Sequence, residues 1–257
     1  VNRLLFSPEV LPGLTMLVPA HNEERSVVTN VRNLMRMDYP NYRLIVIHDG
    51  SRDGTMRVLD EAFDLERVGR PRTGALGTKP VRAVYRSRTV GGLTVVDKVG
   101  GGKADALNVG INLCTSPLFC TVDADSVIEP EALAKAVYRN LMSESEAIAV
   151  GGTILPANGC RLSGGWVTEA GVPRSKVAGF QMVEYLRAFL AGRLGWARLG
   201  ALSIISGAFG VFSRRRVVQA GGYLTSSGEF RRSTMGEDME LVVRLGRLMR
   251  SEGDRKS

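Results

Sequence analysis

The chain has 257 residues, of which 44% are hydrophobic, so it can bury the core of one sizeable α/β domain or of two small ones. Its formal net charge of +8 at pH 7 suits a diphosphate ligand, an anionic membrane surface or a nucleic acid, and does not choose among them. The three cysteines are odd in number and widely spaced, which excludes a disulfide framework and a paired-cysteine zinc site and fits a reducing compartment.

Targeting and membrane-spanning segments are not expected in this chain. Val1 to Phe6 lacks the apolar core of a signal peptide, and the chain has no initiator methionine. The longest uncharged run, Leu199 to Ser213, is shorter than the roughly 20 residues that a helix needs to cross a bilayer. We therefore take the start of the chain to be a fragment boundary.

Strands and helices are expected to alternate in the first third of the chain. Leu14 to Val18, stopped by Pro19, and Arg43 to Ile47 are apolar runs typical of buried strands. We expect a helix after each, the first capped by Asn22 with two glutamates in its first turn and the second near residues 56–63. This alternation predicts right-handed crossovers and a parallel sheet, with ligands at the carboxyl ends of its strands.

Further elements follow toward the middle of the chain. Val81 to Tyr85 is expected to form a third strand, and Leu118 to Val122 a fourth. Between them, Gly91 to Gly102 is expected to form a glycine-rich loop that leads into a helix from about Ala104. A helix is also expected at Pro130 to Met142.

The pattern loosens after Ala147 to Val150. Phe180 to Leu202 is apolar with arginines interspersed, which fits a helix lying on a membrane interface. An ordinary core helix with snorkelling arginines fits equally well. A last helix is expected from about Glu237 to Met249.

Acidic residues directly follow two of the predicted strands. Asp123 and Asp125 would point the same way from the end of an extended strand, where carboxylates can hold Mg²⁺ or Mn²⁺ against a diphosphate. A structural turn is the alternative for a bare Asp-x-Asp, and the position at the mouth of a parallel sheet favours the metal site. Asp49 is either a third carboxylate in the same crevice or an exposed turn residue.

A lysine and an acidic pair precede two of the predicted helices. Lys103 follows Gly100 to Gly102 at a helix start, where a cation suits a diphosphate. A Walker loop is excluded, because Ala104 replaces the Ser or Thr that would bind the metal. For Glu237 and Asp238, spacing alone favours helix capping over a catalytic role.

Four groups of segments share an order and spacing with a known family. The segments are Val18 to Glu24, Ile47 to Asp53, Gly102 to Asn108 with Asp123 to Asp125, and Ser206 to Gly210 with Gly236 to Asp238. Together they resemble glycosyltransferase family 2, in particular its membrane-bound, often processive synthases of cellulose, hyaluronan and poly-N-acetylglucosamine. The resemblance implies the α/β GT-A fold, a Rossmann-like, mostly parallel sheet with helices on both faces. It further implies one domain, 1–257, in which about 14–150 bind the nucleotide and about 151–257 the acceptor.

The resemblance also implies an activity and its residues. We expect an inverting glycosyltransferase that moves a hexosyl or N-acetylhexosaminyl group from a nucleotide diphosphate sugar, UDP-linked by expectation, to a polysaccharide or lipid-linked acceptor. The implied residues are Ala20, Glu23 and Asp49 for the nucleoside, Lys103 for the diphosphate, Asp123 for the nucleotide, Asp123 with Asp125 for Mg²⁺ or Mn²⁺, Asp238 as general base, and Ser206 to Gly210 along the acceptor site. The expected location is the cytoplasmic face of the inner membrane, through segments outside this chain, with no nucleic-acid partner.

The sequence departs from the family pattern at two points. His48 stands where many members have an Asp, which puts the nucleobase contacts in doubt. The Gln-x-x-Arg-Trp motif of processive members is absent, so we expect a truncated domain with weak or no polymerising activity on its own.

Other functions remain open. Within the transferases, the alternative is a single addition to a lipid or lipid phosphate. A sugar nucleotidyltransferase would need a Gly-rich, Arg-containing loop after the first strand, which Pro19 to Glu24 does not provide. A non-catalytic nucleotide-sugar binder is a third possibility, and nucleic-acid binding is the least favoured class because no basic helix is present.

Overall fold

The computed structural model describes residues 11–69, 74–141, 148–163, 166–198, 202–226 and 236–252. Val1 to Phe6 and part of the loop 69–80 lie outside these ranges, as do Met142, Ala147 and residues 199–201 of the expected elements.

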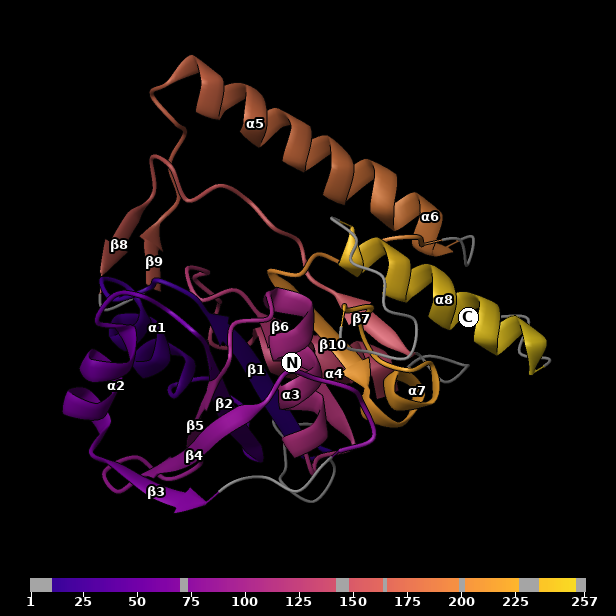
Figure 1. The fold of residues 1–257 in the computed structure, drawn as a ribbon. Coiled ribbons are helices and arrows are strands. Elements are labelled where there is room, and N and C mark those ends of the chain that lie inside the picture. Colours follow the sequence, from indigo (N-terminus) through magenta and orange to yellow (C-terminus); the bar gives the residue numbers. More distant parts are fainter. Residues whose placement is uncertain are drawn as a thin grey trace.

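An eight-stranded sheet forms the centre of the molecule, in the order β3-β4-β5-β2-β1-β6-β10-β7 (Figure 1). The strands are β1 (Leu14–Ala20), β2 (Tyr42–Asp49), β3 (Leu65–Gly69), β4 (Val81–Ser87), β5 (Leu93–Lys98), β6 (Leu118–Val122), β7 (Ala149–Gly151) and β10 (Phe209–Ser213). The four middle strands β5, β2, β1 and β6 are parallel to one another. On one side, β4 is antiparallel to β5 and β3 is antiparallel to β4. On the other side, β10 is antiparallel to β6 and β7 is antiparallel to β10. A separate ribbon pairs β8 (Arg161–Ser163) with β9 (Trp166–Glu169).

Helices cover both faces of the sheet. The helices are α1 (Val27–Leu34), α2 (Thr55–Phe63), α3 (Lys103–Leu113), α4 (Ala132–Leu141), α5 (Lys176–Leu186), a π-helix (Arg187–Arg193), α6 (Leu194–Arg198), α7 (Arg214–Gln219) and α8 (Glu237–Ser251). Alternate residues of β1 point to opposite faces, so Met16 and Val18 pack with α1, α2 and α4, while Leu17 packs with α3, α7 and α8. The expected α/β fold with helices on both faces is therefore confirmed.

The first strand and helix differ from the expected boundaries. Strand β1 runs past Pro19 to Ala20, because pairing with β2 continues there while pairing with β6 ends at Leu17. A proline is tolerated where its strand pairs on one side only, because the N–H that it lacks is not needed for a hydrogen bond on the other side. Helix α1 begins at Val27, and Asn22 lies before it in the left-handed region at φ 58°, so the expected cap was wrong.

The expected glycine-rich loop is also wrong in its middle. Leu93 to Lys98 form β5, a buried strand between β2 and β4, and the glycines flank it. Strand β4 is antiparallel to β5, so the third predicted strand lies outside the parallel core. Strand β3 was not expected, because at the exposed edge of the sheet it carries no apolar run.

The apolar segment in the second half is helical but hardly buried. In Figure 1 it runs from α5 to α6 as one rod apart from the sheet. Helix α5 has no buried residue, and Phe189 is the buried residue of the π-helix, so the core-helix interpretation does not hold for α5. Among the described residues, no helix combines the length and the apolar character that crossing a membrane requires.

Candidate active site

Three charged side chains from separate segments meet beside the end of β6. Lys103 begins α3, Asp123 directly follows β6, and Asp238 is the second residue of α8. The Lys103 Nζ lies 2.6 Å from Asp123 Oδ1. A Cβ atom placed on Gly207 would lie 2.5 Å from Asp238 Oδ2 and 2.6 Å from Lys103 Nζ, so both charged groups reach the same point.

The fold explains why these groups converge. Strand β10 runs antiparallel to β6 with Phe209 opposite Val122, and this register brings the segment before β10 next to the residues after β6. Gly207 in that segment donates its N–H to Asp238 Oδ2 at 2.8 Å. The absence of a side chain on Gly207 is required here, because a Cβ would occupy the space of the charged groups.

Burial changes the acidity of Asp238. It raises the pKa of this carboxyl above its ordinary value, and the nearby Glu237 and Asp123 carboxylates raise it further. The Lys103 cation and the Gly207 N–H act in the opposite direction. The net effect is a carboxylate that holds a proton more readily than an exposed aspartate does.

Asp123 and Asp125 lie in a turn rather than in an extended strand. Strand β6 ends at Val122, and Ser126 donates its N–H to the carbonyl oxygen of Asp123 at 3.1 Å. Because they lie beyond the strand, the alternation of side chains along a strand does not determine where the Asp123 and Asp125 carboxylates point. Asp125 is exposed, and the side chain of Asp123 is 34% exposed despite its ion pair.

The carboxylates after β6 can supply some, but not all, of the ligands of a hard divalent cation. The described residues contain no cluster of three or more His, Cys, Asp or Glu side chains that could hold a metal by themselves. Mg²⁺ is commonly held by one or two carboxylates together with substrate phosphates and water. Asp123 and Asp125 can supply the carboxylates, and the phosphate oxygens would have to come from a bound nucleotide.

Asp49 is not an exposed turn residue, since it is only 4% exposed at the end of β2. Its carboxylate accepts the N–H groups of Gly101 at 2.9 Å and Gly102 at 2.7 Å, and contacts Lys98 Nζ at 2.5 Å. It also borders a cavity of about 340 Å³. The lining residues of that cavity are His21, Asp49, Lys79 and Gly100 to Lys103.

The other residues expected at the nucleoside have protein partners. Ala20 is buried at the end of β1 opposite His48. His48 is buried too, and its Nδ1 lies 2.9 Å from Asp97 Oδ1. The carboxylate of Glu23 accepts a hydrogen bond from the Ser26 hydroxyl. Their contacts with a nucleoside stay predictions.

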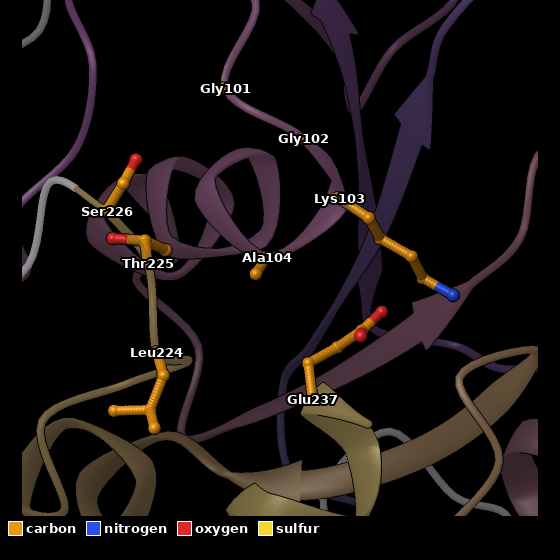
Figure 2. A pocket seen from close by; sticks show the side chains of 8 residues that line it. All are labelled: Gly101, Gly102, Lys103, Ala104, Leu224, Thr225, Ser226 and Glu237. Atoms are coloured by element: carbon orange, nitrogen blue, oxygen red, sulfur yellow. The ribbon is translucent and has the colours of Figure 1, made fainter. Parts of the chain in front are cut away.

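A second cavity, of about 130 Å³, lies between the start of α3 and the start of α8 (Figure 2). Figure 2 shows Lys103 from α3 and Glu237 from α8 on its border. Its remaining lining residues are Gly101, Gly102, Ala104, Leu224, Thr225 and Ser226. Lys103 borders both cavities, so it stands between the space beside Asp49 and the space beside α8.

Sequence reasoning missed three charged residues of this region, Lys79, Lys98 and Asp105. Of these, Lys98 is the one whose side chain is fully buried. It fell inside the expected glycine-rich loop, and the structure places it at the end of β5 with its side chain fully buried. The apolar pair Val95 and Val96 just before it was the available signal for a strand.

Comparisons with known proteins assign the family. The family model described as Glycosyl transferase family 2 matches residues 15–206. A poly-β-1,6-N-acetyl-D-glucosamine synthase of Staphylococcus aureus is 24% identical over 213 residues, which are 82% of this chain and 42% of the relative. A probable glycosyltransferase of Bacillus subtilis, YdaM, is 30% identical over 156 residues, which are 59% of this chain and 31% of the relative. The chain thus spans less than half the length of these relatives.

Solved glycosyltransferase structures share the fold. A mannosyltransferase of Pyrobaculum calidifontis in complex with GDP-Man and Mn²⁺ superposes with a TM-score of 0.60 at 19% identity, over 91% of this chain and 52% of that one. Staphylococcus aureus TarS 1–349 in complex with UDP-GlcNAc gives 0.51 at 15% identity, over 91% of this chain and 53% of that one. The chain therefore belongs to glycosyltransferase family 2, and its α/β fold is that of the GT-A glycosyltransferases.

Proposed function

We propose that this domain transfers a sugar from a nucleotide diphosphate sugar to a hydroxyl of a growing polysaccharide, with inversion at the anomeric carbon. The observation that carries the proposal is the meeting of Lys103, Asp123 and Asp238 at one point beside the end of β6. Two carboxylates and a cation there can serve a diphosphate leaving group and an attacking hydroxyl at the same time.

The leaving group would be stabilised beside Lys103. Negative charge grows on the diphosphate as its bond to the anomeric carbon breaks, and a fixed cation at the start of α3 lowers the energy of that state. A Mg²⁺ or Mn²⁺ ion held by Asp123 and Asp125 would neutralise phosphate charge as a Lewis acid. The pairing of Lys103 with Asp123 in the described structure keeps its Nζ beside the expected diphosphate position.

Asp238 would be the general base. The acceptor oxygen attacks the anomeric carbon as the bond to the diphosphate breaks, and its proton passes to Asp238. A single displacement of this kind inverts the anomeric centre. The raised pKa of Asp238 makes its carboxylate a better proton acceptor, and the hydrogen bond from Gly207 N–H orients it.

For the substrates, we propose a UDP-linked hexose or N-acetylhexosamine as donor and a polysaccharide as acceptor. The similarity to the poly-β-1,6-N-acetyl-D-glucosamine synthase of Staphylococcus aureus and the UDP-GlcNAc bound to TarS support this choice. We also propose that residues 14–150 bind the nucleotide and that 151–257, including Ser206 to Gly210, contribute the acceptor side. Sizing of the product distinguishes a polymer from a single addition to a lipid.

A thermal-shift screen tests the donor and the cation together. The screen compares UDP, GDP, UDP-GlcNAc and GDP-mannose, each with and without Mn²⁺. We expect the UDP compounds to raise the unfolding temperature, more strongly with Mn²⁺, because a ligand that binds only the folded state stabilises it. Equal unfolding temperatures with and without every nucleotide would contradict the proposal.

We also propose that the protein works at the cytoplasmic face of the inner membrane, with α5 against the lipid surface. Supporting this, Val177 is 79%, Phe180 73% and Val183 62% exposed on α5, and Arg187 follows on the π-helix. Apolar and basic residues together are typical of interfacial helices. Cosedimentation with phosphatidylglycerol vesicles, but not with phosphatidylcholine vesicles, is the expected result. Failure to bind either vesicle would contradict this part of the proposal.

A further inference from the structure

Lys98 is a buried cation with three oxygen atoms close to its ammonium group. Its side chain is 0% exposed at the end of β5. The Nζ lies 2.5 Å from Asp49 Oδ1, 2.7 Å from the carbonyl oxygen of Val99 and 2.8 Å from Asp105 Oδ1. The contacts with Asp49 and Val99 are hydrogen bonds, and the contact with Asp105 is an ion pair.

Stability alone does not explain such an arrangement. Burying an ammonium and two carboxylates costs several kcal/mol per ion, and an apolar replacement of a whole buried ion cluster is often neutral or stabilising. Among the lysines and arginines that the structure describes, only Lys98 is completely buried. A cluster of this kind is useful where it holds backbone in one geometry.

The two carboxylates that Lys98 joins hold the loop of Gly100 to Gly102. On one side, Asp49 accepts the N–H groups of Gly101 and Gly102. On the other side, Asp105 accepts the N–H of Lys79 at 3.0 Å, and the Nζ of Lys79 donates to the carbonyl oxygen of Gly100 at 2.7 Å. The loop is therefore fixed from both sides through groups that meet at one cation.

The packing of the loop leaves little room for another conformation. A Cβ on Gly50, which follows Asp49 at φ +64°, would lie 2.7 Å from the N atom of Gly100. The backbone after β2 thus packs directly on the loop. The same loop borders the 340 Å³ cavity and leads into Lys103, the residue that pairs with Asp123.

We propose that Lys98 is a positioning residue for donor binding. It orients Asp49, which orders the amides of Gly101 and Gly102 and sets the start of α3 so that Lys103 reaches the diphosphate. Because its side chain is fully buried, Lys98 acts through these groups and does not touch the substrate. This inference rests on the proposed function, since it concerns the same donor site.

The test compares the loss of a buried lysine with the loss of an exposed one. Lys98→Met keeps the length of the side chain and removes the charge. Lys135→Met is the matched control, because Lys135 lies on α4 with 57% of its side chain exposed. The affinity for UDP with Mn²⁺ is measured by calorimetry, and hydrogen exchange is followed in the peptide that contains Gly101 and Gly102.

For Lys98→Met we expect UDP affinity to fall roughly 10- to 100-fold, as is typical when a group that orients a binding residue is lost. Exchange should become faster at Gly101 and Gly102 and stay unchanged in β1 and β6, which a general loss of stability would not produce. Lys135→Met should bind UDP within about threefold of the wild type, a difference below 1 kcal/mol.

The other outcomes separate a failure of the positioning role from a failure of the proposed function. If the wild type binds UDP and folded Lys98→Met binds it equally well, the positioning assignment is wrong and the proposed function stands. If the wild type binds no nucleotide diphosphate, the proposed function fails first. The double variant Lys98→Met with Asp105→Asn removes the surplus buried carboxylate in case Lys98→Met alone does not fold. Loss of folding in both variants, or restored UDP affinity in the double variant, would overturn the positioning role.

Discussion

The parallel core and the segment from residue 148 to 198 differ in how they satisfy their apolar and polar groups. In β1, β2 and β6 nearly every residue is buried, and the turns that follow β1 and β2 are hydrogen-bonded to each other. In the other region, β8 is exposed throughout and α5 has no buried residue. The parallel core is thus a self-supporting scaffold, whereas the second region presents apolar surface of the kind that marks interaction sites.

The largest expected stability effect lies on the scaffold side. Leu17→Ala removes a fully buried side chain of β1 that packs against α3 near Gly110. We expect a loss of about 2–5 kcal/mol in the free energy of unfolding, from lost burial and the cavity left behind. Urea denaturation measures it, and a loss below about 1 kcal/mol would show that the core is less tightly packed than described.

At the edge of the parallel core, beside the end of β6, Gly207→Ala should act on activity. The new Cβ would lie 2.5 Å from Asp238 Oδ2 and 2.6 Å from Lys103 Nζ, so one charged group must move. We expect kcat/KM to fall by about 10²-fold, as misplaced catalytic groups typically cause. Gly91→Ala, where a Cβ meets nothing within 4 Å, is the matched control and should retain activity.

The pH dependence of the rate sharpens the assignment of the base. Asp238 must be ionised to accept a proton, so kcat/KM should fall as pH drops through its raised pKa. The Lys103 cation lowers that pKa, and therefore Lys103→Met should move the acid limb to higher pH, in addition to lowering the rate. An acid limb that stays in place or moves to lower pH would contradict the described arrangement.

The smallest stability effect is expected in the second region. Phe180→Ser replaces a side chain that is 73% exposed, so the free energy of unfolding should change by no more than about 0.5 kcal/mol. Binding to phosphatidylglycerol vesicles should nevertheless weaken, since apolar area at the lipid surface is lost. A large loss of stability would show that α5 packs on the body of the protein and would remove the contrast between the regions.

Short-range patterns were sufficient for most of the parallel core. Strand β6 has the predicted bounds, and β1, β2 and α2 lie within two residues of prediction, because apolar runs and helical periodicity are local properties. The meeting of Lys103 with Asp123 agrees with the topology rule for parallel sheets. The proximity of Asp238 was implied only by the resemblance to the family, because spacing alone favoured a helix cap there.

Features that depend on distant partners could not be predicted. Asn22 looked like a helix cap, but it bonds to the turn after β2, some 30 residues away. The strand at Leu93 to Lys98 was hidden by its glycine-rich flanks and by a charged residue whose two carboxylate partners lie elsewhere in the chain. The need for a glycine at position 207 likewise depends on α3 and α8, which bring Lys103 and Asp238 next to it.

The most direct test of the account is the substitution Asp238→Asn, which keeps the size of the side chain and an acceptor for the Gly207 N–H but removes the base. Transfer is measured as release of UDP from UDP-GlcNAc in the presence of an oligosaccharide acceptor, and donor affinity by calorimetry. We expect the turnover rate to fall on the order of 10²- to 10⁴-fold while donor affinity stays within a few-fold. Turnover equal to that of the wild type would contradict this expectation.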